Sequence, residues 1–159
     1  MEKPIISAVV PDTSQSKVTV YGVPDKPGIA ASLFRPLADR DVNVDMIVQN
    51  TSEEGVTDIS FTVPSEQLEI GKEITSQAAT VIGAQGVDTD NTIGRVSVVG
   101  AGMASNPGVA ATIFETLSNN SINIGMISTS AIRVSCVVAR EDVERATVAL
   151  HEAFELDKG

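Results

Sequence analysis

One short turn combines a carboxylate, a glycine and small side chains in a way that suits ligand binding. It is Asp25-Lys26-Pro27-Gly28-Ile29-Ala30, at the start of an apolar pattern with helical spacing. Backbone N–H groups at a helix start have no intrahelical acceptor, so they can bind a carboxylate. Gly28 lets a ligand approach the main chain, and the small Ala30 leaves room beside it. Asp25 could neutralise an ammonium group. The turn therefore predicts a site for a free amino acid, which carries both charges.

Two further side chains could support Asp25 in this role. We expect the amide oxygens of Asn43 and Gln49 at the two ends of the strand that follows the helix. A second interpretation stays open at this point, because aspartate ahead of a helix most often caps its N-terminus. The two interpretations differ in what the carboxylate contacts, a ligand or the helix itself.

The residue sets that catalysis or metal binding would need are missing from the sequence. Its one histidine, His151, lies in a predicted C-terminal helix, and no serine or cysteine nucleophile has a histidine near it in sequence. No H-E-x-x-H or C-x-x-C motif is present. Gly100-Ala101-Gly102 follows a predicted strand as a dinucleotide fingerprint would, but the third glycine of that motif is replaced by Ser105. We therefore expect no catalytic residue, no metal site and no cofactor.

Charge and composition indicate which kinds of partner the protein does not bind. The formal net charge is −10 and the pI is about 4.4, whereas nucleic-acid binding is driven by clustered lysine and arginine. The single cysteine, Cys136, cannot form an internal disulfide, and no signal-peptide pattern begins the sequence. No apolar run approaches the roughly 18 residues that span a bilayer. We expect a cytoplasmic protein that binds neither nucleic acid nor membrane.

A duplication organises the chain. Residues 27–50 align without gaps on residues 107–130, with nine identities in 24 positions. Each copy opens with an alternating strand, at 18–22 or 96–100, and continues with a Pro-Gly pair and apolar residues at helical spacing. Proline is tolerated in the first turn of a helix, so the sequence predicts that a helix begins at each Pro-Gly pair.

The remaining predicted elements give both copies the same order of strands and helices. They are strands at 43–49, 57–63 and 85–90 with a helix at 66–81 in the first copy, and strands at 123–129 and 132–138 with a helix at 140–154 in the second. The first copy thus has the ferredoxin-like order β-α-β-β-α-β, whereas the second lacks its last strand.

An apolar strand expected at Ile5–Val10 is surplus to the first copy. We predict that it crosses over to complete the sheet of the second copy; a frayed N-terminal tail is the alternative. The expected fold class is α+β, with two ferredoxin-like modules. The first holds residues 15–92, and the second, discontinuous in sequence, holds residues 93–159 with 1–12.

The two copies differ in charge where a ligand would bind. Asp25 and Asp45 of the first copy are replaced by Ser105 and Gly125 in the second, although the residues that specify the fold are kept. The copies should therefore contribute differently to any site. The second copy's expected contributions are Asn123, Ile124 and Ser130.

These features together resemble the pair of ACT domains in the regulatory region of aspartate kinase, an enzyme of lysine, threonine and methionine synthesis. The resemblance covers essentially the whole chain. It runs through VTVYGVPDKPGIAASLF, VNVDMIVQN, TDISFTVP, GRVSVVGAGMASNPGVAATIFETL, INIGMISTSAIRVSCVV and ALHEAFELDKG. It implies ferredoxin-like ACT modules without catalytic activity, a homodimer of ACT pairs, and the catalytic α subunit of aspartate kinase as a partner, with the chain resembling the separate β subunit of such kinases.

The resemblance also implies allosteric feedback, with threonine, lysine or both bound between ACT modules. The positions that it implies for effector contacts are Asp25 to Ala30, Asn43, Val44, Asp45 and Gln49 in the first module, and Val109, Ala110, Asn123, Ile124, Ser130 and Ala131 in the second. Lysine-sensitive relatives usually carry glutamate where this sequence has Ala131, and alanine cannot pair with a lysine ammonium. We therefore expect threonine as the effector. The alternative function is an ACT-pair sensor for a different amino-acid-metabolising enzyme.

Overall fold

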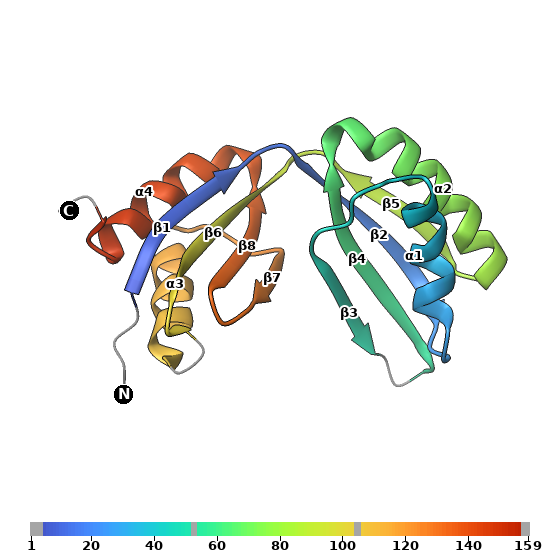
Figure 1. Ribbon diagram of the computed structural model, residues 1–159, viewed down its shortest axis with the longest axis horizontal. Helices are drawn as coiled ribbons and strands as arrows, with labels where there is room; N and C mark the ends of the chain where they lie inside the picture. The colour runs from blue at the N-terminus through green and yellow to red at the C-terminus, as the bar shows by residue number, and fades with distance from the viewer. Residues whose placement is uncertain (1–4, 52–53, 104–105, 157–159) are drawn as a thin grey trace. The chain divides into compact units, whose positions relative to one another are not determined.

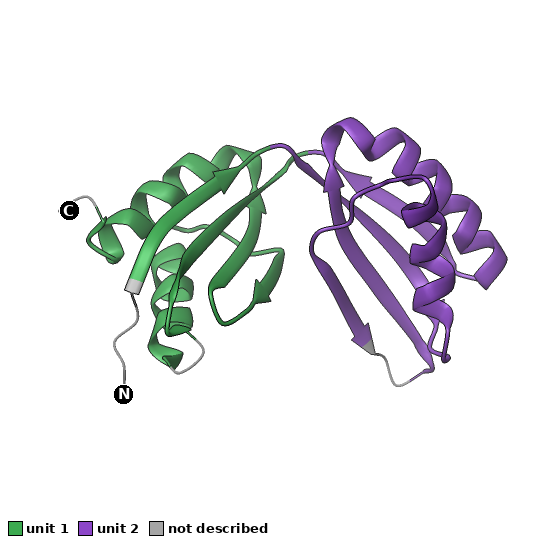
Figure 2. Ribbon diagram, in the orientation of Figure 1, with its two compact units in different colours: residues 1–13, 92–159 green, residues 14–91 purple. Residues whose placement is uncertain are grey.

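The computed structural model describes residues 5–51, 54–103 and 106–156 of the chain, which forms two compact units (Figure 2). Residues 14–91 form one unit, which we call the continuous module. Residues 1–13 and 92–159 form the other, which we call the discontinuous module. Each module has a four-stranded antiparallel sheet and two helices, so the predicted α+β class is confirmed.

The continuous module has the element order β-α-β-β-α-β (Figure 1). Its strands are β2 (Gln15–Pro24), β3 (Ile47–Thr51), β4 (Val56–Pro64) and β5 (Gly86–Asp90). Its helices are α1 (Ile29–Asp39) and α2 (Leu68–Ile82), with a 3-10 turn, η1 (Ser65–Gln67), before α2. The sheet order is β3-β4-β2-β5 with every pair antiparallel, as in a ferredoxin-like fold.

The discontinuous module repeats this arrangement with its edge strand taken from the start of the chain. Its strands are β1 (Ile5–Asp12), β6 (Ile93–Ala101), β7 (Met126–Thr129) and β8 (Arg133–Ala139). Its helices are α3 (Pro107–Asn119) and α4 (Val143–Ala153), with a 3-10 turn, η3 (Arg140–Asp142), before α4. The sheet order is β1-β6-β8-β7, so β1 takes the place that β5 has in the other module.

The pairing of β1 with β6 confirms that the N-terminal strand crosses over, and the frayed-tail alternative is wrong. The two strands are antiparallel, with Val9 opposite Val98 and Asp12 opposite Arg95. The Arg95 guanidinium also donates a hydrogen bond to the Asp12 carboxylate, at 3.0 Å, and so fixes the C-terminal end of β1.

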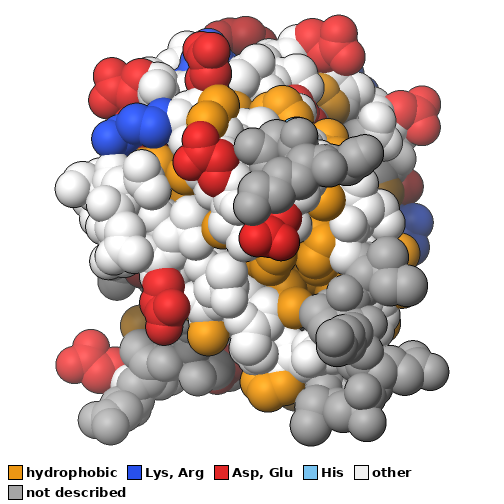
Figure 3. All heavy atoms as spheres, turned by 90° about the vertical axis from the view of Figure 1, so that its left-hand side faces the viewer, with side chains coloured by type: hydrophobic (Ala, Val, Ile, Leu, Met, Phe, Trp, Pro, Cys, Tyr) orange, Lys and Arg blue, Asp and Glu red, His pale blue; other side chains and the backbone are white. Residues whose placement is uncertain are grey.

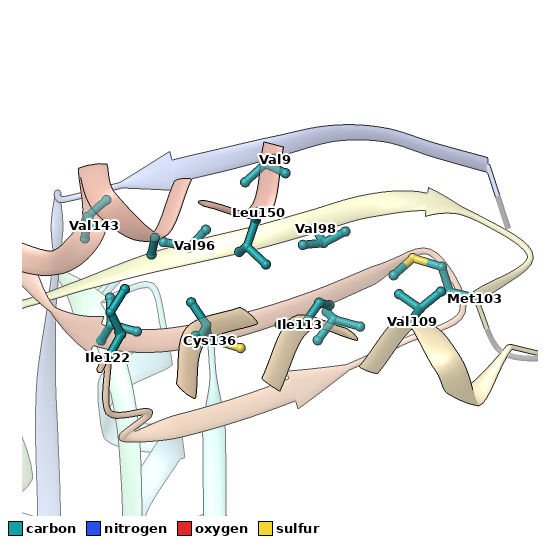
Figure 4. Close-up of a cluster of buried hydrophobic side chains, with 14 residues drawn as sticks. Val9, Val96, Val98, Met103, Val109, Ile113, Ile122, Cys136, Val143 and Leu150 are labelled. Atoms are coloured by element: carbon teal, nitrogen blue, oxygen red, sulfur yellow. The ribbon is translucent and has the colours of Figure 1, made fainter. Parts of the chain in front are cut away.

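Each module has its own hydrophobic core between sheet and helices. In the continuous module, Leu33 and Leu37 of α1 pack fully buried against the sheet, with Phe34 and Phe61 in an edge-to-face contact at 5.2 Å between ring centroids. Figure 4 shows the core of the discontinuous module, in which Ile113 of α3 lies among residues of the sheet. The helical spacing seen in the sequence therefore marked the buried helix faces correctly.

The edge strands begin later than the sequence predicts, at Ile47 instead of Asn43 and at Met126 instead of Asn123. Thr62 explains the first difference, because its carbonyl accepts from the Asp45 N–H at 3.0 Å and its hydroxyl from the Met46 N–H at 3.1 Å. Two residues thus share one position of the ladder, which interrupts regular pairing.

The two Pro-Gly pairs also differ. Helix α3 begins at Pro107 as predicted, whereas α1 begins at Ile29, after Gly28 adopts a left-handed conformation with φ 87°. Glycine adopts that conformation without the steric cost of a side chain. Among the described residues, no helix is both long and apolar enough to cross a membrane.

Candidate functional site

The turn before α1 is exposed, and its main chain at Gly28 is accessible to a ligand. The Asp25 N–H donates to the Gly55 carbonyl at 2.9 Å, while its carboxylate forms no hydrogen bond or ion pair with any other described residue. A Cβ atom placed on Gly28 would meet nothing within 4 Å, so a ligand has room to reach the main chain there. Residue Gly28 precedes α1 with no side-chain cap, so the interpretation of Asp25 as the helix cap is wrong.

N–H groups without an intrahelical acceptor follow Asp25 in the chain, at the start of α1. The Ser32 N–H donates to the Gly28 carbonyl at 3.0 Å, whereas the N–H groups of Ala30 and Ala31 precede the first intrahelical acceptor. The positive end of the helix dipole adds to their attraction for an anion. The turn thus offers a donor pair for a carboxylate and an acceptor for an ammonium within a few residues.

A cavity lies at the opposite end of α1. It has a volume of about 370 Å³ and contains the predicted residues Asn43 and Val44. Its lining is Phe34, Ala38, Asp41, Val42, Asn43, Val44 and Ile47. The Gln67 side chain fixes the loop at the cavity, because it accepts from the Asn43 N–H at 2.9 Å and donates to the Asp41 carbonyl at 3.0 Å.

Within the continuous module the structure does not bring Asn43 to Asp25. Helix α1 has 11 residues, which is about 16 Å at 1.5 Å per residue, and the two side chains belong to its opposite ends. The expected help of Asn43 for Asp25 is therefore wrong within one module. Gln49 lies exposed on β3, opposite Ile59 of β4, and Asp45 is exposed beside the cavity.

The discontinuous module has an equivalent cavity, at the C-terminal end of its own first helix, α3. Its volume is about 470 Å³, and it is lined by Phe114, Ser118, Ser121, Ile122, Asn123 and Ile124. Every one of these residues is the duplication partner, 80 positions later, of a residue that lines the first cavity. The duplication has thus preserved a cavity as well as a fold.

The cavities also show what sequence reasoning missed. Phe34 and Phe114 each line their cavity, but neither was among the predicted site residues. Their identity in both copies was the available signal, although an aromatic residue at helical spacing is more readily interpreted as core.

A smaller cavity of about 250 Å³ lies at the start of α3. Three predicted residues, Val109, Ala110 and Ser130, line it together with Met103, Asn106, Pro107, Thr129 and Val134. The Ser130 N–H donates to the Arg133 carbonyl at 2.7 Å, which closes the turn between β7 and β8. Ala131 is exposed in that turn, and Ser105 lies outside the described residues.

The equivalent cavities differ in charge. Asp41 lines the first, with Asp45 nearby, whereas the partner positions in the second module are Ser121 and Gly125. No group of three or more metal-binding side chains occurs in the described part of the chain. Both cavities combine amide groups with apolar side chains, and the lining of the first adds a carboxylate.

Two family models match the chain, and both describe an ACT domain. One covers residues 17–83 and the other residues 96–154. With a ferredoxin-like module under each match, the chain is defined as a tandem pair of ACT domains.

Known proteins that contain such a pair identify the family. The chain is 47% identical over 157 residues to an aspartokinase of Pseudomonas aeruginosa, a match that covers 99% of this chain and 38% of that protein. It covers 99% of the chain from a crystal structure of aspartokinase alpha and beta subunits, with 46% identity, a TM-score of 0.88 and 94% of this chain matched. It also covers 99% of the regulatory subunit of aspartate kinase from Thermus thermophilus, with 35% identity, a TM-score of 0.89 and again 94% of this chain.

The chain belongs to the family of aspartate kinase regulatory regions, built from two ACT domains. It spans 38% of the length of the full aspartokinases that it matches, whereas it covers nearly all of the regulatory subunit from Thermus thermophilus.

Proposed function

We propose that this chain binds an end-product amino acid and thereby regulates a catalytic aspartate kinase polypeptide by feedback inhibition. The observation that carries the proposal is that predicted effector residues are accessible to a ligand, both in the open turn before α1 and in the pair of equivalent cavities at the other end of the first helix of each module. Membership of the aspartate kinase regulatory family supplies the enzyme that is regulated. Catalysis then belongs to the partner, and the chain acts in the cytoplasm as a homodimer.

Threonine is the effector that we favour. The residues available for recognition are main-chain N–H groups, amides and one carboxylate, which suit the backbone of an amino acid and a neutral hydroxyl. Ala131 offers no partner for a lysine ammonium. An E. coli aspartokinase III solved in complex with lysine and aspartate is 22% identical, a likeness that extends to the fold alone.

Titration calorimetry of the purified chain with threonine, lysine, methionine and isoleucine tests the proposal. We expect heat of binding from threonine and a weaker response, or none, from the other three. A folded chain that binds none of the four would contradict an effector role, and lysine binding as tight as threonine binding would contradict the choice of effector.

The substitution Asp25→Asn tests the ammonium partner. We expect threonine to bind about tenfold more weakly, because the amide keeps the shape of the side chain but loses its charge. Stability should not change, since the carboxylate caps no helix. Asp39→Asn is the matched control, because Asp39 is equally exposed on α1 and pairs with Arg35 at 3.8 Å.

A further inference from the structure

The outer surface of α4 has an apolar centre. Val148 is 53% exposed there and borders two adjoining cavities, of about 420 and 450 Å³. Ala149 lines the first cavity, and Pro11 and Thr147 line the second. Figure 3 views the molecule from the side of the discontinuous module and shows hydrophobic side chains exposed between acidic ones. We call this surface, centred on Val148, the α4 face.

The duplication shows that this apolar centre is particular to one module. Val148 is the sixth residue of α4, and the sixth residue of α2 is Glu73, an exposed glutamate of the usual solvent-facing kind. Both helices follow a 3-10 turn after equivalent central strands, β4 and β8, so the two positions correspond. The same fold therefore does not require an exposed apolar residue here.

Acidic side chains outnumber basic ones at the rim of the α4 face, where Arg145 lines the first cavity and Arg140 the second. Glu141 and Glu144 line both cavities and Glu152 lines one, and none of the three forms an ion pair with another described residue. The Arg145 guanidinium is already engaged, since it donates to the Asp142 carboxylate at 2.7 Å. A complementary partner would place an apolar side chain against Val148 and lysine or arginine around it.

Arg145 also connects this surface to the candidate effector cavity. Its second nitrogen donates to the Asn120 carbonyl at 2.8 Å, and Asn120 directly precedes the loop Ser121–Ile124 that lines the cavity. Asn120 itself lines one cavity of the α4 face. A partner on α4 and a ligand at the loop would thus contact parts of the molecule that one side chain holds together.

We propose that the α4 face docks a segment of the catalytic aspartate kinase polypeptide, which presents an apolar side chain flanked by basic residues. The inference rests on the proposed function, which requires such a polypeptide, and the full aspartokinases that the chain matches are much longer than it, since the matches cover 38% of them. The acidic rim and the valine that replaces a glutamate define the chemistry of the segment.

Affinity for the catalytic aspartate kinase chain of the same organism, measured with both proteins at full length, tests the docking. The substitution Val148→Glu introduces the residue that the other module carries, and we expect it to weaken binding at least tenfold. Glu144→Lys should also weaken binding, because it brings a positive charge against a basic segment. Raising the salt concentration should weaken binding of the wild-type chain and have a smaller effect on Glu144→Lys.

Val81→Glu is the matched control, since Val81 is 85% exposed at the end of α2 and lies in the continuous module. It should leave the affinity unchanged, and Val148→Glu should keep its heat of amino-acid binding. Unchanged docking by Val148→Glu, or equal weakening by Val81→Glu, would overturn the inference but leave the proposed function standing. A wild-type chain that does not bind the kinase would overturn the proposed partnership, and the inference with it.

Discussion

Ala131 occupies an exposed turn between β7 and β8, next to Ser130 of the cavity at the start of α3. We expect Ala131→Glu to tighten lysine binding about tenfold, because a carboxylate there could form a charge-assisted hydrogen bond with the lysine ammonium. Titration calorimetry measures the change, and threonine binding should stay as it was. Ala131→Gln is the control: an equal gain with the neutral side chain would show that charge is not the cause.

Cys136 gives the module a pH dependence that can be measured. Burial raises the pKa of this thiol from 9.0 to about 11, because the thiolate would lose its hydration in the core. The protonated thiol of Cys136 stabilises the folded state fully at pH values below the unfolded-state pKa of 9.0. This stabilisation is lost as the pH rises towards the folded-state pKa of about 11, because the unfolded chain then gives up its proton more readily. We expect the wild-type free energy of unfolding to fall by about 2 kcal/mol more than that of Cys136→Ala between pH 8.5 and 10.5.

Urea unfolding of both proteins across this pH range makes the comparison. Other groups that titrate at alkaline pH affect the two proteins alike, so the difference between them isolates the thiol. Parallel loss of stability in both would mean that Cys136 ionises in the folded state as easily as in the unfolded chain.

At the scale of elements, both cavities depend on how the first helix of each module ends. Asp41 and Ser121 adopt the left-handed conformation, with φ 56° and 57°. The next residue, Val42 or Ile122, then donates its N–H to the carbonyl of Leu37 or Leu117, which closes the helix end as in a Schellman motif.

Glycine should be better than serine at this helix end, because it reaches a positive φ without steric cost. We expect Ser121→Gly to raise the free energy of unfolding by about 0.5–1 kcal/mol. Ser118→Gly, three residues earlier and inside α3, is the control and should cost about 0.5 kcal/mol. Urea denaturation monitored by circular dichroism provides both values, and destabilisation by Ser121→Gly would show that the serine side chain matters more than the backbone.

The helices and strands were predictable from the sequence because apolar residues recur in it at the spacing of one buried helix face or one buried strand face. Leu33 and Leu37 are spaced for one helix face, and they are buried in the structure. The start of β3 was not predictable, since residues distant in sequence decide it: the Thr62 hydroxyl and the Gln67 side chain bind main-chain groups of the 41–46 loop. Before β7, the Gly125 N–H likewise donates to the carbonyl of the distant Val137, at 2.8 Å.

The candidate site was predictable only in part. Asn43 was expected for its amide oxygen and Asn123 as a contribution of the second copy, and both line cavities. Which residues converge was not predictable, because Asn43 and Asp25 belong to opposite ends of α1, and strand and helix lengths set that distance. The α4 face was missed because an apolar residue within a helix is ordinarily interpreted as core, and only its exposure in the fold distinguishes Val148.

At the scale of the whole molecule, the discontinuous module should depend on β1. Val9 is 6% exposed in its core, so we expect Val9→Asp to cost about 3–5 kcal/mol and to unfold this module first. Hydrogen exchange should then show lost protection in residues 92–156 and kept protection in residues 14–91. Val10→Asp is the control, because Val10 is 40% exposed on the next position of the same strand.

The contribution of β1 also has a consequence for the order in which the chain folds. Ile5 pairs with Ala101, so the first strand to be synthesised must wait for a partner about a hundred residues later. Lys17 pairs with Asp90 in the continuous module, which brings the two ends of that module side by side. Once this module has folded, β1 and β6 extend from adjacent points, and little of the entropic cost of closing a long loop remains. We therefore expect the inserted module to fold first and to lower the entropic cost of pairing β1 with β6.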